Sequence, residues 1–385
     1  MSEIQQKKQS ISAIKVLHVI STRGLYGGER VLVNLIGHLN PDSIATKTAI
    51  LFDKQKPAND VVQAIEEQGS SCVIIPCGKR FDLNAVRQLA KTIKDLDIDI
   101  IHCHEIKGRL YGLLTAKYLH VPLITSHHNW IRNKLSTTIF EYLDAVYLRF
   151  FDKIIPVSSS VFRMLRKYII PAKKMKIIIN GIDFKKPDIN NSKQTELRSS
   201  LHIKDKNHII GVVGRLSPEK GQSYFLKAAQ IILKSIDNVS FVIVGDGHMR
   251  RELEEYAHSL HINEHVIFTG FRYDVVDFYS LLDVCIMPST IEGTPMALLE
   301  AMSHGIPAIA SDVGGIPDII HHMKNGILVP PQSPEAIAKA VQLLLGDFKL
   351  YDHLSKTAQQ MVQDQFSARR MASQYEEEYQ RLMQT

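Results

Sequence analysis

Short apolar segments alternate with amphipathic segments along this chain, and the alternation runs through two separate series. Residues 14–20 (IKVLHVI) read as a buried strand, and residues 29–39 carry apolar side chains at helical spacing. Similar pairs follow up to residue 157, and a second series opens with an apolar segment at residues 208–213. Alternation of this kind produces mostly parallel sheets covered by helices. We therefore predict an α/β fold.

A polar stretch separates the two series. Residues 188–200 (DINNSKQTELRSS) read as a surface connection. The length of 385 residues is roughly two and a half times that of a usual domain. We predict two Rossmann-like domains, at residues 1–190 and 205–364, facing a cleft in which ligands bind at the carboxyl ends of the strands.

Composition and cysteine usage narrow the class of protein. Apolar residues make up 45% and charged residues 22% of the chain, which is ordinary globular usage. The four cysteines show no CxxC spacing and are too few for a disulfide scaffold, so a reducing compartment is expected. The N-terminal MSEIQQKKQS lacks the apolar core of a secretory signal, and the apolar runs fall short of the roughly 18 residues that cross a bilayer. We predict a cytoplasmic enzyme.

The net charge of +6 is unevenly distributed. Residues 1–200 hold 30 Lys and Arg against 18 Asp and Glu, whereas residues 201–385 hold 16 against 22. Residues 132–186 alone carry 12 basic and 4 acidic side chains, enough to attract an anionic ligand or surface. Anionic lipid, an anionic glycan and nucleic acid are the candidate partners. Nucleic acid is disfavoured, because residues 163–176 interleave only one aromatic side chain, Tyr168, with their cations.

The most informative stretch is residues 288–315, PSTIEGTPMALLEAMSHGIPAIASDVGG. Pro295 suits the first turn of a helix, so backbone N–H groups near Gly293, Thr294 and Met296 would point out of a helix N-terminus, which favours phosphate. Glu300 would lie about a turn further in, able to accept bonds from hydroxyl groups. Taken alone, the pattern also fits an ordinary capped helix.

Two further loops carry glycine next to charge. Residues 212–221 (VVGRLSPEKG) place Arg215 and Lys220 directly after a strand, where two cations could neutralise a diphosphate, and Gly214 permits close backbone approach. The alternative is a pair of solvated loop charges. Early in the chain, Gly27 and Gly28 end a loop and begin a helix, which fits either a ligand lying against the backbone or a simple tight turn.

Together, in this order, these motifs closely resemble the family 4 retaining glycosyltransferases of the GT-B fold. The resemblance covers nearly the whole chain: GGER early, PVSS and INGIDF before the connection, GRLSPEKG and VGDG after it, and then EGTPMALLEAMSHG. It implies a transferase that moves a sugar from a nucleotide sugar. It also implies that a last helix, at residues 365–385, returns to the N-terminal domain.

The resemblance implies a donor site in the C-terminal domain. Arg215 and Lys220 would hold the diphosphate and stabilise the charge that develops on the leaving group. Glu300 would bind the ribose, and Glu292 would orient the donor sugar and support oxocarbenium character. The other implied donor contacts are Gly214, the backbone of Gly293, Thr294, Pro295 and Met296, and Phe271 and Arg272 near the base. The alternative interpretation is that Phe271 is a packed aromatic side chain and Arg272 a surface charge.

The N-terminal domain would complete the site. The resemblance implies that Gly27 and Gly28 let the diphosphate approach, and that His127 contacts the donor sugar, with the adjacent His128 as a rival. His104 is a weaker candidate for the acceptor site. The dyads His102–His104 and His321–His322 invite a metal, but no third and fourth ligands follow at zinc-like spacing. We predict neither a metal nor another cofactor.

The implied reaction is a metal-independent front-face substitution, since Glu292 is the only serious candidate for a carboxylate nucleophile. We expect a UDP-linked sugar donor, because UDP is the commonest nucleotide in such donors. We expect the acceptor to be a glycan or a lipid-linked sugar in the synthesis of a cell-surface polysaccharide or glycolipid. The basic N-terminal half favours peripheral attachment to the inner face of the cell membrane. An epimerase or a phosphorylase-like relative on the same fold is the alternative activity, and a nucleic-acid-binding protein is the alternative class.

Overall fold

The computed structural model describes residues 13–22, 24–52, 59–78, 81–128, 135–184, 191–204 and 206–384. The chain divides into two compact units. Unit 1 comprises Met1–Pro156, Met164–Ile178 and Arg369–Thr385, and unit 2 comprises Val157–Arg163 and Ile179–Ala368. The domain boundaries predicted from the sequence, at residues 190, 205 and 364, stay predictions.

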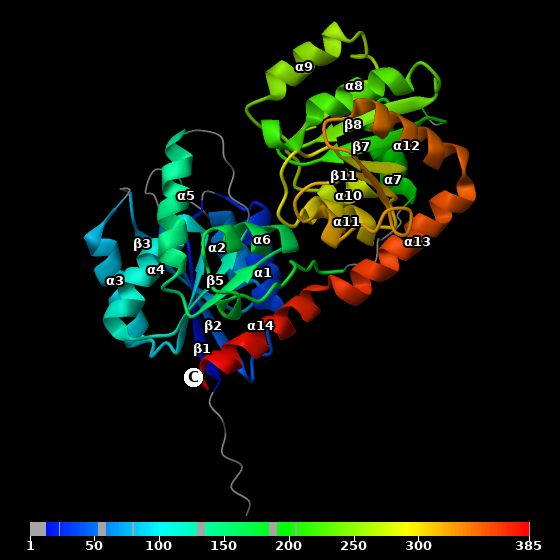
Figure 1. The fold of residues 1–385 in the computed structure, drawn as a ribbon. Coiled ribbons are helices and arrows are strands. Elements are labelled where there is room, and N and C mark those ends of the chain that lie inside the picture. The colour runs from blue at the N-terminus through cyan, green and yellow to red at the C-terminus, as the bar shows by residue number, and fades with distance from the viewer. Residues whose placement is uncertain are drawn as a thin grey trace, which may run out of the picture. The chain divides into compact units, whose positions relative to one another are not determined.

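Unit 1 is built on a six-stranded parallel sheet in the order β3-β2-β1-β4-β5-β6 (Figure 1). The strands are β1 (Ile14–Ile20), β2 (Ile44–Phe52), β3 (Ser71–Pro76), β4 (Ile100–His104), β5 (Leu123–His127) and β6 (Lys153–Pro156). The helices with residues in this unit are α1 (Gly27–His38), α2 (Asn59–Glu66), α3 (Leu83–Asp95), α4 (Glu105–Leu119), α5 (Leu135–Leu148), α6 (Ser159–Lys167), η1 (Ala172–Lys174) and α14 (Ala368–Leu382). Every residue of β4 and β5 is buried, as expected for a sheet covered on both faces.

Unit 2 repeats the plan with a parallel sheet in the order β12-β11-β10-β7-β8-β9. The strands are β7 (His208–Val213), β8 (Val239–Val244), β9 (Val266–Gly270), β10 (Val284–Met287), β11 (Ala308–Ser311) and β12 (Ile327–Val329). The remaining helices are α7 (Asn191–Ser200), η2 (Pro218–Lys220), α8 (Gln222–Ile232), α9 (Arg250–Ser259), α10 (Val275–Tyr279), α11 (Met296–Ser303), η3 (Ile316–Asp318), α12 (Pro334–Gly346) and α13 (Phe348–Gln365). The prediction of two Rossmann-like parallel sheets is confirmed.

The predicted surface connection at residues 188–200 is wrong for its larger part. Residues 191–200 form helix α7, while residues 188–190 lie outside the described part of the chain. The helix is polar overall, which concealed it, but Leu197 and Leu201 pack against a buried cluster of unit 2 that includes Ile203. An amphipathic helix needs only such a narrow apolar stripe to be held against a core.

One close approach in unit 2 explains two glycines. Gly245, after β8, has a φ of 136°, and a Cβ there would lie 2.0 Å from the carbonyl oxygen of Gly214, after β7. Gly214 itself has a φ of 155°. Any side chain at residue 245 would push these two loops apart, so glycine is required where both strands reach their carboxyl ends.

The described helices include none with the length and apolar character needed to cross a lipid bilayer.

Candidate active site

Two loops of unit 2 meet at the carboxyl ends of β7 and β10. We call residues 214–221 the cation loop and residues 288–295 the EGTP loop. The backbone N–H of Thr290 donates to the carbonyl oxygen of Glu219 at 2.8 Å. A Cβ on Gly221 would lie 2.1 Å from the carbonyl oxygen of Pro288, so the loops touch backbone to backbone. Such contact fixes their side chains at the strand ends, where α/β sheets bind ligands.

Both cations of the cation loop are paired with carboxylates. Arg215 Nη2 lies 2.6 Å from Glu219 Oε1, and Lys220 Nζ lies 2.7 Å from Glu292 Oε1. Burial by itself would raise the pKa of Glu219, but the hydrogen bonds from the Ser217 hydroxyl and Arg215 outweigh it, so this pKa is lowered. The side chain of Arg215 is 56% exposed, so its guanidinium is open to a phosphate while it holds Glu219.

Glu292 is held from several sides. Its carboxylate also accepts from the Ser289 hydroxyl at 2.7 Å, and its carbonyl oxygen accepts from Gly315 N–H at 3.2 Å. Gly314 has a φ of 59°, and a Cβ there would lie 1.9 Å from that same carbonyl oxygen. The DVGG segment that closes the informative sequence stretch therefore fixes the backbone of Glu292.

Helix α11 follows the EGTP loop. It begins at Met296 with Pro295 as its N-cap, one residue later than expected, so the first-turn amides face the loop. The Thr294 hydroxyl donates to the Val157 carbonyl oxygen at 2.6 Å, which fastens the loop and leaves its backbone for other contacts. Glu300 accepts a hydrogen bond from Tyr279 at 2.8 Å. Sequence reasoning missed Tyr279, because a buried tyrosine in an apolar helix reads as core.

The residues predicted near the base follow β9. Phe271 is 53% exposed and meets Tyr273 edge to face at 4.9 Å between ring centroids. Arg272 is tied to Asp274 through two hydrogen bonds of 2.8 and 2.5 Å, and its guanidinium lies over the Phe278 ring. An open aromatic face suits a base, whereas Arg272 already has a carboxylate partner.

In unit 1, Gly27 and Gly28 are the first two residues of α1. A Cβ on either would meet nothing within 4 Å, so packing does not require glycine at these positions. Glu29 is buried and accepts from the Thr22 hydroxyl at 2.6 Å and from Tyr26 N–H at 3.2 Å, an arrangement that fixes the start of the helix. The two glycines thus present open backbone at a well-anchored helix N-terminus.

His127 ends β5 with its imidazole buried. Its Nε2 lies 3.6 Å from Asp144 Oδ2, and Asp144 in turn forms a bidentate pair with Arg109 at 2.7 and 2.6 Å. Burial lowers the pKa of His127 although Asp144 opposes the effect, and burial lowers the pKa of His128 to about 4. Sequence reasoning missed Arg109 and Asp144, which belong to other elements than His127. The sugar contact assigned to His127 stays a prediction, and in this structure the imidazole lies against Asp144.

His104, the weaker acceptor candidate, lies in a cluster of three buried histidines. His18 of β1 is in register with His102 of β4, and its Nδ1 lies 3.1 Å from His104 Nε2. The sequence search for a third metal ligand missed His18, because it belongs to a strand far away in the chain. Among the described residues, these three form the one group whose ligand atoms are close enough to hold a metal ion.

The observed bonds of the histidine cluster favour a hydrogen-bond network. His102 Nδ1 lies 2.7 Å from the Tyr379 hydroxyl, and His102 Nε2 lies 2.8 Å from the Ser126 hydroxyl, which also bonds Tyr375. Both tyrosines belong to α14. Burial lowers the pKa of all three histidines, that of His18 to about 3, so the cluster is neutral at pH 7. The network therefore anchors α14 to the sheet of unit 1.

Acid should destabilise unit 1. In the unfolded chain these histidines bind protons as the pH falls through about 6.5, whereas in the folded cluster their lowered pKa keeps them neutral. The contribution of the histidine cluster to the free energy of unfolding is therefore full above about pH 6.5 and is lost as the pH falls below it. Each histidine adds about 1.4 kcal/mol per pH unit in that window. Scanning calorimetry from pH 7 to 5 should show a falling transition temperature for unit 1. His18→Gln should flatten that slope, and the exposed His353→Gln should not; equal slopes in both variants would contradict the assignment.

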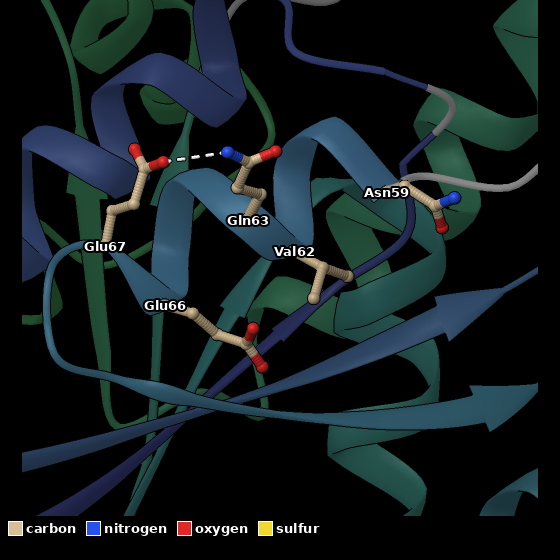
Figure 2. A pocket seen from close by; sticks show the side chains of 5 residues that line it. All are labelled: Asn59, Val62, Gln63, Glu66 and Glu67. Carbon is tan, nitrogen blue, oxygen red and sulfur yellow. Dashed lines mark hydrogen bonds between the residues drawn. The ribbon is translucent and has the colours of Figure 1, made fainter.

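A hollow on α2 is excluded as the phosphate site. It has a volume of about 520 Å³ and is lined by Asn59, Val62, Gln63, Glu66 and Glu67 (Figure 2). The Gln63 amide donates to the Glu67 carboxylate at 2.9 Å, as the dashed line in Figure 2 marks. Two carboxylates and no cation in the lining would repel a diphosphate.

The parallel sheet of unit 2 carries paired cations, a buried carboxylate and a helix N-terminus beyond its carboxyl edge. This arrangement is typical of enzymes that handle phosphorylated ligands. Comparison with known proteins narrows this class. The model of group 1 glycosyl transferases matches residues 193–361, and that of glycosyltransferase family 4 matches residues 26–186. An uncharacterized glycosyltransferase of Methanocaldococcus jannaschii is 32% identical over 280 residues, which cover 70% of this chain and 72% of the relative. The protein therefore belongs to the group 1, family 4 glycosyltransferases.

Other similar proteins agree on the activity and the fold. A galactosyltransferase of Escherichia coli, which acts on GlcNAc-diphosphoundecaprenol with UDP-Gal, is 26% identical over 297 residues, covering 74% of this chain and 76% of the relative. The crystal structure of Anabaena HepE with UDP and glucose has a TM-score of 0.83 at 21% identity, over 94% of this chain and 98% of that one. The fold is thus GT-B, and the protein is a glycosyltransferase, as the resemblance implied.

Proposed function

We propose that this enzyme moves a sugar from a UDP-linked donor to a glycan or lipid-linked acceptor in the synthesis of a cell-surface polysaccharide or glycolipid. The observation that carries the proposal is the Lys220–Glu292 pair at 2.7 Å, beside Arg215 and the start of α11. A diphosphate needs cations, and a sugar needs a carboxylate that accepts from its hydroxyls. This corner of unit 2 offers both.

Relatives support the donor and acceptor classes. The E. coli relative uses UDP-Gal and a diphosphoundecaprenol acceptor. A Streptococcus pneumoniae relative, 30% identical over 247 residues that cover 60% of this chain and 56% of the relative, is an alpha-monoglucosyldiacylglycerol synthase. The first acts on a lipid-linked sugar and the second is named for a glycolipid. UDP also occupies the Anabaena HepE structure.

Donor binding exchanges the partners of Lys220. Without a donor, the ammonium of Lys220 is neutralised by Glu292. A diphosphate carries more charge than one carboxylate and takes the ammonium, which releases the Glu292 carboxylate toward the hydroxyls of the attached sugar. Recognition of the phosphates and recognition of the sugar are coupled in this way. A nucleoside diphosphate without a sugar takes Lys220 away from Glu292 and offers the carboxylate no hydroxyl groups in exchange.

The reaction proceeds by front-face substitution with retention. The bond between the sugar C1 and the β-phosphate oxygen breaks, the acceptor oxygen bonds C1 on the same face, and the acceptor proton passes to the leaving phosphate. Arg215 and Lys220 stabilise the charge on that phosphate, which is the task a metal ion performs in other transferases, and we propose that no metal is needed. The network of Lys220 and Ser289 around Glu292 supports a hydrogen-bonding role for Glu292 and not that of a nucleophile.

We place the enzyme in the cytoplasm at the inner face of the cell membrane. The excess of basic residues in the first half of the chain supports this placement. Anionic lipid attracts such a surface with about 1 kcal/mol for each cation near it.

A thermal-shift panel of nucleoside diphosphates and nucleotide sugars, in EDTA and in Mg²⁺, tests the donor proposal. UDP and one UDP-sugar should raise the transition temperature equally under both conditions. A response to GDP or ADP alone would overturn the assignment of the base, and a response that vanishes in EDTA would overturn metal independence. If no nucleotide stabilises the protein, the donor site is refuted.

A further inference from the structure

Large apolar side chains are exposed on unit 1 over α4, α5 and the turn that follows α6. They are Tyr118, Tyr142, Leu143, Val146, Phe150 and Ile169. Tyr118 is 71% and Ile169 is 78% exposed. We call these residues, with the cations among them, the docking face. A scattered apolar side chain is ordinary on a surface, whereas a contiguous group marks an interaction site.

Contacts link the three segments that carry these side chains. The ammonium of Lys117, on α4, lies 3.8 Å from the centroid of the Phe150 ring, just beyond α5. The rings of Tyr142 and Tyr168 meet edge to face at 5.6 Å. Arg149 Nη2 donates to the Tyr168 carbonyl oxygen at 3.1 Å, which ties the end of α5 to the turn after α6. Helix α4 also contacts α5, and the two are neighbours in Figure 1.

The charge of the docking face is positive. Lys117 and Arg149 contact its aromatic residues, and the ammonium of Lys174 donates to the carbonyl oxygens of Arg149 and Phe151 at 2.9 and 2.8 Å. Lys167 and Lys173 are exposed on the neighbouring segments of the chain. Two carboxylates with described side chains lie near these cations in the sequence, and both are engaged. Asp144 of α5 is buried in its pair with Arg109, and Asp152, between α5 and β6, accepts from Leu123 N–H at 2.8 Å. Of the basic stretch predicted from the sequence, Arg132, Lys134, Lys185 and Lys186 lie outside the described residues.

Aromatic rings interleaved with cations suit the boundary between water and an anionic bilayer. Tyrosine and phenylalanine insert among the headgroups, while lysine and arginine keep their charged ends at lipid phosphates. A second copy of the chain would present the same positive charge and be repelled. We propose that the docking face attaches unit 1 to an anionic membrane surface.

The docking face lies away from the strand ends of unit 1 at which the candidate site residues lie. Tyr118 precedes β5 and Phe150 precedes β6, so the face lies toward the amino ends of these strands. His104 and His127 lie at the opposite, carboxyl ends of β4 and β5. Attachment through the docking face would hold the enzyme at its lipid without occupying the strand ends. The inference rests on the proposed function for its biological purpose, because a lipid-linked acceptor is where attachment matters.

Vesicle sedimentation of the purified full chain tests the proposal. Vesicles of phosphatidylcholine with phosphatidylglycerol should bind the protein, with an affinity that falls as NaCl is added. The double variant Arg149→Gln/Phe150→Ser should lose on the order of tenfold in partitioning, about fivefold of it from the single charge. The matched control is Phe348→Ser/Lys349→Gln, an exposed aromatic and cation that begin α13 in unit 2, and it should bind as the unmodified protein does.

Three results would overturn the docking face. They are no binding to anionic vesicles, equal binding to pure phosphatidylcholine, and equal losses in the two double variants. If sedimentation equilibrium without lipid shows a dimer that Arg149→Gln/Phe150→Ser abolishes, the face is a self-association surface and the proposal is wrong. Nucleotide-induced thermal shifts on the same samples keep the two proposals apart: a failure there refutes the donor site, and a failure with vesicles alone refutes the docking face.

Discussion

Replacing Lys220 with alanine should lower kcat/KM by about two to three orders of magnitude, the usual effect of removing one group aimed at charge that develops in a transition state. In the unmodified enzyme, the ammonium of Lys220 stabilises the negative charge that develops on the leaving diphosphate. A charge-assisted hydrogen bond also contributes to ground-state binding, so the Kd for nucleoside diphosphate should rise by roughly 10- to 100-fold. Product formation from a radiolabelled donor measures the first effect, and calorimetry measures the second.

The exposed Lys227, on α8 of the same unit, supplies the control for charge. Lys227→Ala removes the same charge outside the cation loop and should change neither quantity. Equal effects in both variants would mean that the unit attracts nucleotides by overall charge. Unchanged activity in Lys220→Ala would remove this residue from the donor site.

Replacing Glu292 with glutamine should separate sugar recognition from phosphate recognition. Turnover should fall by about 10²- to 10³-fold, because the amide lacks the negative charge that supports an oxocarbenium-like sugar. Nucleoside diphosphate without a sugar should bind about fivefold tighter, because the diphosphate no longer competes with a carboxylate for Lys220. Opposite directions for turnover and nucleotide affinity are the signature of the partner exchange.

The Glu292→Gln experiment has two independent checks. Glu252→Gln, at an exposed position of α9, makes the same chemical change away from the loops and should alter neither quantity. Intact-mass spectra of the unmodified enzyme with donor should show no glycosyl adduct. An adduct on Glu292 would replace front-face substitution by double displacement, and weaker nucleotide binding in Glu292→Gln would contradict the exchange.

The sequence predicted those parts of the molecule that depend on local pattern. Strand–helix alternation predicted both sheets, and the order of motifs along the chain predicted that residues 214–221 and 288–295 belong to one site. Hydropathy concealed α7, because its apolar stripe becomes visible only against the cluster it covers. His18 and Tyr279 were missed for a different reason. Each acquires its role from a partner on another element, and one sequence alone does not reveal strand register or side-chain direction.

The position of α14 has a consequence for synthesis. Residues 369–385 belong to unit 1 together with residues 1–156, and the buried Tyr375 and Tyr379 complete the bonds of Ser126 and His102. The ribosome makes these tyrosines only after all of unit 2. Until then, polar side chains on the sheet of unit 1 lack the hydrogen bonds that these tyrosines provide. The unit that is translated first therefore completes its folding last. A nascent chain that stalls within unit 2 therefore leaves an incomplete unit 1 exposed to chaperones and proteases.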